Sequence, residues 1–343
     1  MEAPALETYD LENAASRPWR RELADAIRDP GELLALLGLD PERMGLGAEA
    51  QREFPLRVPR VYAARMRPGD PRDPLLLQVL PLASETDPAP GFSADPVGDL
   101  AAMAAPGLLH KYQGRALLVI TGACAVHCRY CFRRHFPYGE ANPAGEHWAE
   151  SLAYIAARPE IDEVILSGGD PLSLPDRRLA SMAGDLAAIP HLKRLRIHTR
   201  LPVVLPARVD HGLVRWLSRL ARETTLKPVV VIHANHPHEI DGAVAGAMKR
   251  LAGAGAVLLN QSVLLRGVND DPETLAALSE ALFAAGVLPY YLHRLDRVRG
   301  AAHFEVPDAE AEGIMTALRA RLPGYLVPAF VCEEPGAPYK RPL

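Results

Sequence analysis

Three cysteines stand close together in this chain, and no other feature restricts its fold as strongly. Cys124, Cys128 and Cys131 are separated by three and then by two residues, while Cys332 lies near the C-terminus. Four cysteines in 343 residues are too few for a disulfide scaffold. Clustered thiols are typical of a metal site in a reducing compartment. The chain therefore has to fold so that one short segment presents three thiols to a common centre.

Six short apolar runs alternate with helical patterns from residue 116 onward. This alternation predicts an α/β fold in which parallel strands are covered by helices. Six units indicate a partial barrel, and an open doubly wound sheet is the alternative. In both folds ligands gather at the carboxyl ends of the strands, which is where the cysteine segment begins. The expected strands are 116–121, 163–167, 195–198, 229–233, 257–262 and 287–292, and the expected helices are 148–157, 178–188, 212–222, 242–254 and 272–285.

Three regions are expected along the chain. Residues 1–109 form an N-terminal accessory region, with a helical pattern over 19–39 that is interrupted at 29–31 and an extended connector over 82–107. Residues 110–300 form the barrel. Residues 301–343 form a short C-terminal segment.

Charge and hydropathy exclude several classes of protein. The chain has 38 basic and 42 acidic residues, and this near balance predicts no nucleic-acid partner. No apolar stretch approaches the roughly 18 residues that a membrane span needs. The start, Met1-Glu2-Ala3-Pro4, lacks the basic and then apolar pattern of a signal peptide, so a cytoplasmic protein is expected.

The cysteine spacing favours an iron–sulfur cluster. Three thiolates can bind three irons of a [4Fe–4S] cluster and leave the fourth iron open to another ligand. A structural zinc site, with His127 or His135 as fourth ligand, is the alternative. The pattern Cys-x3-Cys-x2-Cys, with Tyr130 before the last cysteine, resembles the signature of radical S-adenosylmethionine (SAM) enzymes.

This resemblance implies a partial (β/α)6 barrel and a second cofactor. In the family the open iron binds SAM, an aromatic residue lies near its adenine, and reductive cleavage releases a 5′-deoxyadenosyl radical. Ser167-Gly168-Gly169-Asp170 follows the second expected strand and resembles the segment that holds the methionyl amino group. Read alone, it is an ordinary turn. The resemblance assigns to SAM binding Tyr130, Ser167, Gly168, Gly169, Asp170, His233 and Gln261.

Further segments resemble lysine 2,3-aminomutases, which are isomerases. They include Asn260-Gln261-Ser262 and Pro289-Tyr290-Tyr291, and the match runs from about residue 105 to the end. His110-Lys111-Tyr112 and Gly300-Ala301-Ala302-His303-Phe304 resemble the branch that prepares (R)-β-lysine for elongation factor P. The resemblance implies L-lysine as substrate, pyridoxal 5′-phosphate (PLP) as a further cofactor, and a functional link to an elongation factor P lysine ligase and to elongation factor P.

The same resemblance assigns the remaining site residues. Lys340, in a tail with a single nearby glycine (Gly336), matches the lysine that forms the Schiff base with PLP. Arg133 matches the residue that pairs with the substrate carboxylate. Asp296 and Glu333 match the acids that bind the substrate ε-ammonium, and two carboxylates favour lysine over neutral or acidic amino acids. The PLP phosphate is assigned to Lys111, Tyr112 and Arg115.

Other interpretations stay open at this point. One is an aminomutase that makes free β-lysine, which the short tail after Lys340 disfavours. Another is a non-catalytic scaffold protein that uses the cysteines to bind a structural metal. The segment from His233 to His238 also has the composition of a metal site, although it lacks acidic or thiol partners. The sequence does not specify the oligomeric state, and an oligomer is possible. It also does not specify how the site discriminates between lysine and arginine.

Overall fold

A ten-stranded sheet organises the molecule, and its strands follow one another in chain order. This computed structural model describes residues 18–139 and 147–343. The six expected strands are present as β3 to β8, and each pairs in parallel with the next. The α/β barrel prediction is therefore confirmed. The strands are β1 (Met103–Ala105), β2 (Leu108–Tyr112), β3 (Arg115–Val119), β4 (Glu163–Ser167), β5 (Arg194–Thr199), β6 (Lys227–His233), β7 (Val257–Val263), β8 (Leu288–His293), β9 (Ala329–Cys332) and β10 (Arg341–Pro342).

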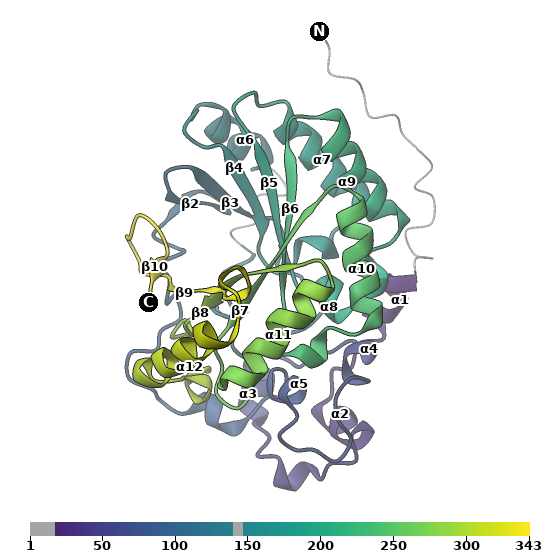
Figure 1. The fold of residues 1–343 in the computed structure, drawn as a ribbon, viewed down its shortest axis with the longest axis vertical. Coiled ribbons are helices and arrows are strands. Elements are labelled where there is room, and N and C mark those ends of the chain that lie inside the picture. The colour runs from purple at the N-terminus through teal and green to yellow at the C-terminus, as the bar shows by residue number, and fades with distance from the viewer. Residues whose placement is uncertain (1–17, 140–146) are drawn as a thin grey trace.

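The five expected crossover helices are also present, as α6, α7, α9, α10 and α11, and Figure 1 shows them outside the sheet. Aspartates start several of them, because a carboxylate can accept the free N–H groups of the first helical turn. Asp241 and Asp271 each accept such a bond, at 2.8 Å. The helices are α1 (Pro18–Ala24), α2 (Pro30–Leu36), α3 (Ala48–Glu53), α4 (Arg60–Ala63), α5 (Pro74–Leu77), α6 (Trp148–Ala156), α7 (Asp176–Ala187), α8 (Leu201–Val204), α9 (His211–Glu223), α10 (Gly242–Gly253), α11 (Pro272–Ala284) and α12 (Asp308–Arg321).

The N-terminal region packs against the barrel through short helices, which lie together at one end of the molecule (Figure 1). The pattern over 19–39 becomes two helices, because Asp29 caps α2 and Pro30 occupies its first turn. The expected connector 82–107 is not merely extended. It carries a 3-10 turn at Ala83–Thr86 and strand β1, and it places Glu85 and Asp99 in the interior. The start of the chain, Met1-Glu2-Ala3-Pro4, lies outside the described residues.

The C-terminal segment lies across from the first strands of the sheet. β9 pairs in parallel with β8, and β10 turns back antiparallel to β9. In Figure 1 the yellow segment around β10 lies beside β2, and an ion pair between Lys111 of β2 and Glu333 joins the two at 2.8 Å. The tail that carries Lys340 therefore closes toward the open side of the barrel.

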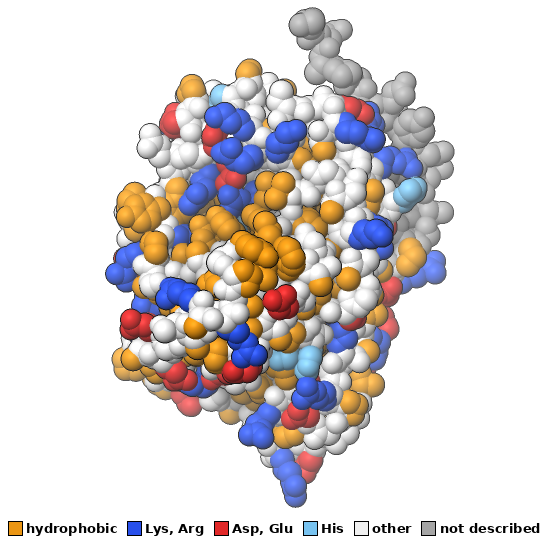
Figure 2. Space-filling model, in the orientation of Figure 1, with side chains coloured by type: hydrophobic (Ala, Val, Ile, Leu, Met, Phe, Trp, Pro, Cys, Tyr) orange, Lys and Arg blue, Asp and Glu red, His pale blue; other side chains and the backbone are white. Residues whose placement is uncertain are grey.

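The face seen in Figure 2 carries hydrophobic side chains near its centre, in front of the strands that Figure 1 labels β5 to β9. Lysine, arginine and acidic side chains surround them in mixed order, so this face has no extended surface of one charge. Among the described residues, no helix has both the length and the apolar character needed to cross a membrane.

Glu85 is a buried anion shared by two arginines of the cysteine segment. Its side chain is 1% exposed, Arg129 Nε donates to it at 2.8 Å, and Arg134 Nη2 lies 2.9 Å from it. Glu85→Gln keeps the shape and leaves two buried guanidinium groups without an anion. We expect the free energy of unfolding to fall by about 3–5 kcal/mol, measured as a lower urea midpoint at unchanged slope. Glu42→Gln, at an exposed site, is the control and should change it by less than about 0.5 kcal/mol. Equal midpoints for both variants would contradict this account.

Candidate active site

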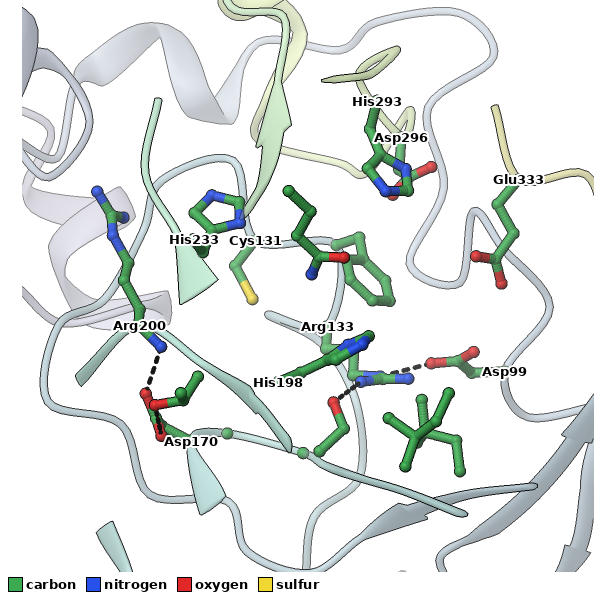
Figure 3. A pocket seen from close by; sticks show the side chains of 18 of the residues that line it. Asp99, Cys131, Arg133, Asp170, His198, Arg200, His233, His293, Asp296 and Glu333 are labelled. Carbon is green, nitrogen blue, oxygen red and sulfur yellow. Dashed lines mark hydrogen bonds and ion pairs between the residues drawn. The ribbon is translucent and has the colours of Figure 1, made fainter. Parts of the chain in front are cut away.

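One cavity, with a volume of about 250 Å³, brings all the predicted site residues together. It reaches from the carboxyl ends of the central strands to the C-terminal tail. Figure 3 shows Arg200 and Asp170 on one side of it, Asp296 and Glu333 on the other, and Cys131 and Arg133 between them. The lining includes Cys124, Cys128, Cys131, Tyr130, Ser167, Gly168, Gly169, Asp170, His233, Gln261, Lys111, Tyr112, Arg115, Arg133, Asp296, Glu333 and Lys340.

The three thiols line this cavity from the loop that follows β3, and none is in a disulfide. Burial raises the pKa of the Cys124 thiol well above its ordinary value, and the neighbouring Cys131 adds to the shift. Burial, with Cys128 nearby, raises the pKa of Cys131 to about 11. Crowded, partly buried thiolates therefore need a strongly cationic partner, which iron ions supply. The donor set fits a [4Fe–4S] cluster, in which each thiolate binds a different iron.

The alternative zinc ligands are engaged elsewhere. His127 stacks on Phe54 and shares a 2.7 Å hydrogen bond with the carbonyl oxygen of Pro55. His135 lies 3.2 Å from the carbonyl oxygen of Arg299. Within residues 18–139 and 147–343, no three His, Cys, Asp or Glu side chains converge on a point where one metal ion would be held. This holds for the segment from His233 to His238 as well.

The two glycines after β4 let two loops approach each other. Gly168 has φ +123°, and a Cβ on Gly169 would lie 2.5 Å from the carbonyl oxygen of Ala123. Gly169 N–H donates to Thr121 O at 2.7 Å, and Asp170 N–H donates to Ala123 O at 2.8 Å. The sequence interpretation assigns these groups to an amino acid ligand, and that assignment stays a prediction. In this structure the close approach is to the backbone of the cysteine loop, so the glycines set the position of the thiols.

Asp170 also lines the cavity, but its carboxylate is committed to the protein. Thr199 Oγ1 donates to it at 2.7 Å, and the backbone N–H groups of Arg200 and Leu201 donate at 2.7 and 2.9 Å. Leu172 N–H adds a fourth bond at 3.0 Å. These bonds tie the end of β4 to the end of β5, so Asp170 acts here by positioning its neighbours.

Tyr130, within the cysteine loop, belongs to a buried polar network. Its ring stacks on His233 with centroids 5.6 Å apart, and its hydroxyl accepts from Asn235 Nδ2 at 2.7 Å. Burial, and then the charge of Arg200, lowers the pKa of His233 to about 3, so this imidazole is neutral near pH 7. His233 ends β6, whereas Gln261 lies two residues before the end of β7. Both nevertheless reach the same cavity.

A chain of ion pairs joins the residues expected to bind PLP and the substrate. Glu333 pairs with Lys340 and with Lys111, the latter at 2.8 Å. Lys111 in turn lies 2.6 Å from Asp99, which accepts from Arg133 Nε at 2.6 Å. Burial opposes the Glu333 carboxylate, but Lys340 and Lys111 outweigh it and lower its pKa to about 2. Each buried charge therefore has a partner of opposite sign.

This charge set suits PLP. A lysine amine, partly buried at 18% side-chain exposure, can form an imine with an aldehyde. Lys111 and Arg115 supply positive charge for a phosphate, and Arg115 lies over the Tyr112 ring at 4.4 Å. Arg196 lines the same cavity and has a buried Nε without a hydrogen-bond partner. The residues present therefore fit the group.

Asp296 faces the same space as Glu333. Burial, and then the charge of Glu333, raises the pKa of Asp296 to about 7. Two histidines lie nearby, His293 buried and His198 partly buried. Desolvation lowers the pKa values of both well below the ordinary value, so both are neutral. This end of the cavity therefore holds an ionised carboxylate (Glu333), a carboxyl group with a pKa near 7 (Asp296) and the two neutral imidazoles.

Several of the residues that line the cavity were not assigned to the site from the sequence. His293 directly follows an expected strand, His198 ends another, and Arg200 lies two residues after that end, so their positions alone could have identified them. Asp99 had no such signal, because it lies in the irregular connector. It connects Arg133 and Lys111 only through the tertiary structure.

Comparison with known proteins shows which family this chain is similar to. The profile of the Radical SAM superfamily matches residues 118–278. The L-lysine 2,3-aminomutase of Escherichia coli (strain K12) is 52% identical over 334 residues, which cover 97% of this chain and 96% of that protein. The L-lysine 2,3-aminomutase of Haemophilus influenzae is 49% identical, covering 94% of each chain. That of Buchnera aphidicola subsp. Baizongia pistaciae is 43% identical, covering 93% of each.

Gly169→Ala tests the contact between the two loops. The added Cβ would meet the backbone of residues 122 and 123 below 3 Å, so the loops have to separate. We expect the free energy of unfolding to fall by about 1–3 kcal/mol and the iron bound per chain after anaerobic reconstitution to drop. Gly253→Ala is the control, because nothing lies within 4 Å of its Cβ position. Wild-type iron content in Gly169→Ala would show that the loop contact does not set the thiol geometry.

Proposed function

Because this chain belongs to the radical SAM superfamily and, within it, to the lysine 2,3-aminomutase family, we propose that it converts L-lysine to (R)-β-lysine by moving the α-amino group to the neighbouring carbon. The observation that carries the proposal is the shared cavity. Three thiols line it together with a lysine and the two acids Asp296 and Glu333. An iron–sulfur cluster and an amine-binding site in one space are what a radical amino migration needs.

When bound, a [4Fe–4S] cluster with SAM supplies a 5′-deoxyadenosyl radical, and PLP supplies the π system that lets an amino group migrate. The cysteines of the cluster follow β3, whereas Lys340 approaches from the tail. The protein therefore brings the two cofactors to one substrate from separate parts of the chain.

The charges of the cavity match the two ends of L-lysine. Arg133 is buried and presents a guanidinium fork, which suits a carboxylate. Asp296 and Glu333 lie beyond it in Figure 3 and suit an ε-ammonium. Substrate binding then exchanges internal ion pairs for pairs with the substrate, which limits the cost of burying its charges.

We assign the remaining residues by cofactor. Cys124, Cys128 and Cys131 hold the cluster. Lys111, Tyr112 and Arg115 hold the PLP phosphate, and Lys340 holds its aldehyde carbon. SAM is bound among Tyr130, Ser167, Gly168, Gly169, Asp170, His233 and Gln261, with Asp170 acting through the backbone of its neighbours.

The use of the product stays a prediction from sequence resemblance. We propose that the (R)-β-lysine is passed to a ligase that modifies elongation factor P. We also propose a cytoplasmic location, because the thiols bind iron only where they stay reduced. A role in making free β-lysine is the second candidate, and it has the same active site.

Lys340→Ala tests the function directly. We expect the reconstituted wild-type protein, incubated anaerobically with L-lysine, SAM, PLP and a strong reductant, to form (R)-β-lysine, as measured by chiral chromatography. The variant should form none, because it lacks the amine that binds PLP. Lys193→Ala, at a side chain 68% exposed, is the matched control and should keep full activity. Formation of 5′-deoxyadenosine without β-lysine in the wild type would refute the substrate and keep the radical SAM assignment.

The pKa of Asp296 predicts how lysine binding depends on pH. A proton on this carboxylate competes with the substrate ammonium, and its pKa is raised to about 7, whereas that of Glu333 is about 2. Lysine affinity should therefore rise about tenfold per pH unit up to about pH 7 and level off above it. Equilibrium dialysis of labelled lysine with the PLP-loaded protein measures this. Asp296→Asn should bind weakly and lose this pH dependence; a flat wild-type profile would disprove the role of Asp296.

A further inference from the structure

Arg200 contacts one of the cysteine sulfurs directly. It follows the last residue of β5, its side chain is 7% exposed, and its Nη1 points at Cys128 Sγ as a hydrogen-bond donor. The same nitrogen donates to the Tyr130 hydroxyl at 2.8 Å. A buried positive charge therefore lies beside a sulfur that the cluster would use.

The guanidinium is held from several parts of the chain. Its Nη2 donates to Glu239 Oε2 at 2.8 Å, to Gln78 Oε1 at 2.8 Å and to the Tyr62 hydroxyl at 3.1 Å. Tyr62 belongs to α4, and Gln78 follows α5, so the N-terminal region forms part of this arrangement. With so many partners, the group cannot swing away from the sulfur without leaving buried polar atoms unpaired.

We infer that Arg200 raises the reduction potential of the cluster through Cys128. In the step concerned, a low-potential one-electron donor gives one electron to the [4Fe–4S]²⁺ cluster, which becomes [4Fe–4S]⁺. No bond is made or broken, and no proton moves. The added negative charge spreads over the irons and sulfurs, so a nearby cation and an N–H donor stabilise the reduced state more than the oxidised one. The inference rests on the cluster of the proposed function and does not depend on lysine as the substrate.

Glu239 provides a test of opposite sign. Its carboxylate is fully buried beside Arg200 and also accepts the backbone N–H groups of Asn235 at 2.8 Å and His236 at 3.2 Å. Glutamine in its place has an oxygen that can accept these bonds, but it removes the negative charge. The positive charge of Arg200 would then act on the sulfur without the opposing negative charge of Glu239. Glu239→Gln should therefore shift the potential upward, whereas loss of Arg200 should shift it downward.

The experiment is an anaerobic redox titration, followed by electron paramagnetic resonance, of reconstituted protein with measured iron and sulfide content. At the wild-type midpoint potential, Arg200→Gln should lower the ratio of reduced to oxidised cluster roughly tenfold, which is ~59 mV for one electron. Arg200→Lys should shift it less, since the charge remains and the fork is lost. Arg208→Lys is the matched control: Arg208 is also buried, but its guanidinium lies over Trp19 and pairs with Asp176, so the potential should not move.

Two results would overturn the inference. One is an unchanged midpoint in Arg200→Gln with a full cluster. The other is a downward or absent shift in Glu239→Gln, which decides the question if Arg200→Gln cannot hold a cluster. Potentials that shift as expected in a protein that makes no β-lysine would support the inference while refuting the substrate of the proposed function.

Discussion

Two backbone hydrogen bonds, from Gly169 N–H to Thr121 O and from Asp170 N–H to Ala123 O, join the loops that follow β3 and β4. They are short because Gly168 and Gly169 have no side chains to hold the loops apart. The cysteine loop is thereby fixed against the parallel sheet. Its three thiols lie above the strands whose ends carry the rest of the site, so the geometry of the cavity follows from this contact.

Charges inside the molecule are paired across regions that are distant in sequence. Glu85 of the N-terminal region forms ion pairs with two arginines of the cysteine segment, and Asp99 connects Arg133 with Lys111. A single buried charge without a partner would be costly, so each of these residues requires the others. The region before the barrel is therefore a structural part of the active site, although the sequence predicted only an accessory region there.

The cavity combines a thiol site and an amine site because the loops that follow the parallel strands and the C-terminal tail both reach it. Loops after parallel strands supply the thiols and the neutral His233, whereas the tail after β9 supplies Glu333 and Lys340. The tail reaches across the open side of the barrel to Lys111. An incomplete barrel leaves room for this approach, which a closed barrel would block.

Sequence alone predicted parallel strands covered by helices, because apolar runs alternate with helical patterns, and it placed the thiols at the carboxyl edge of the sheet. It left a partial barrel and a doubly wound sheet as alternatives, and the structure decided the strand order. Resemblance supplied the residues of the cofactor and substrate sites, and the structure brings them all to one cavity. Only the tertiary structure decided what the glycines contact, that Asp170 is committed to backbone N–H groups, and that Asp99 and Arg200 belong to the site. The reason is physical: a pattern along the chain specifies which face a side chain takes, but a buried charge finds its partner only when distant segments pack together.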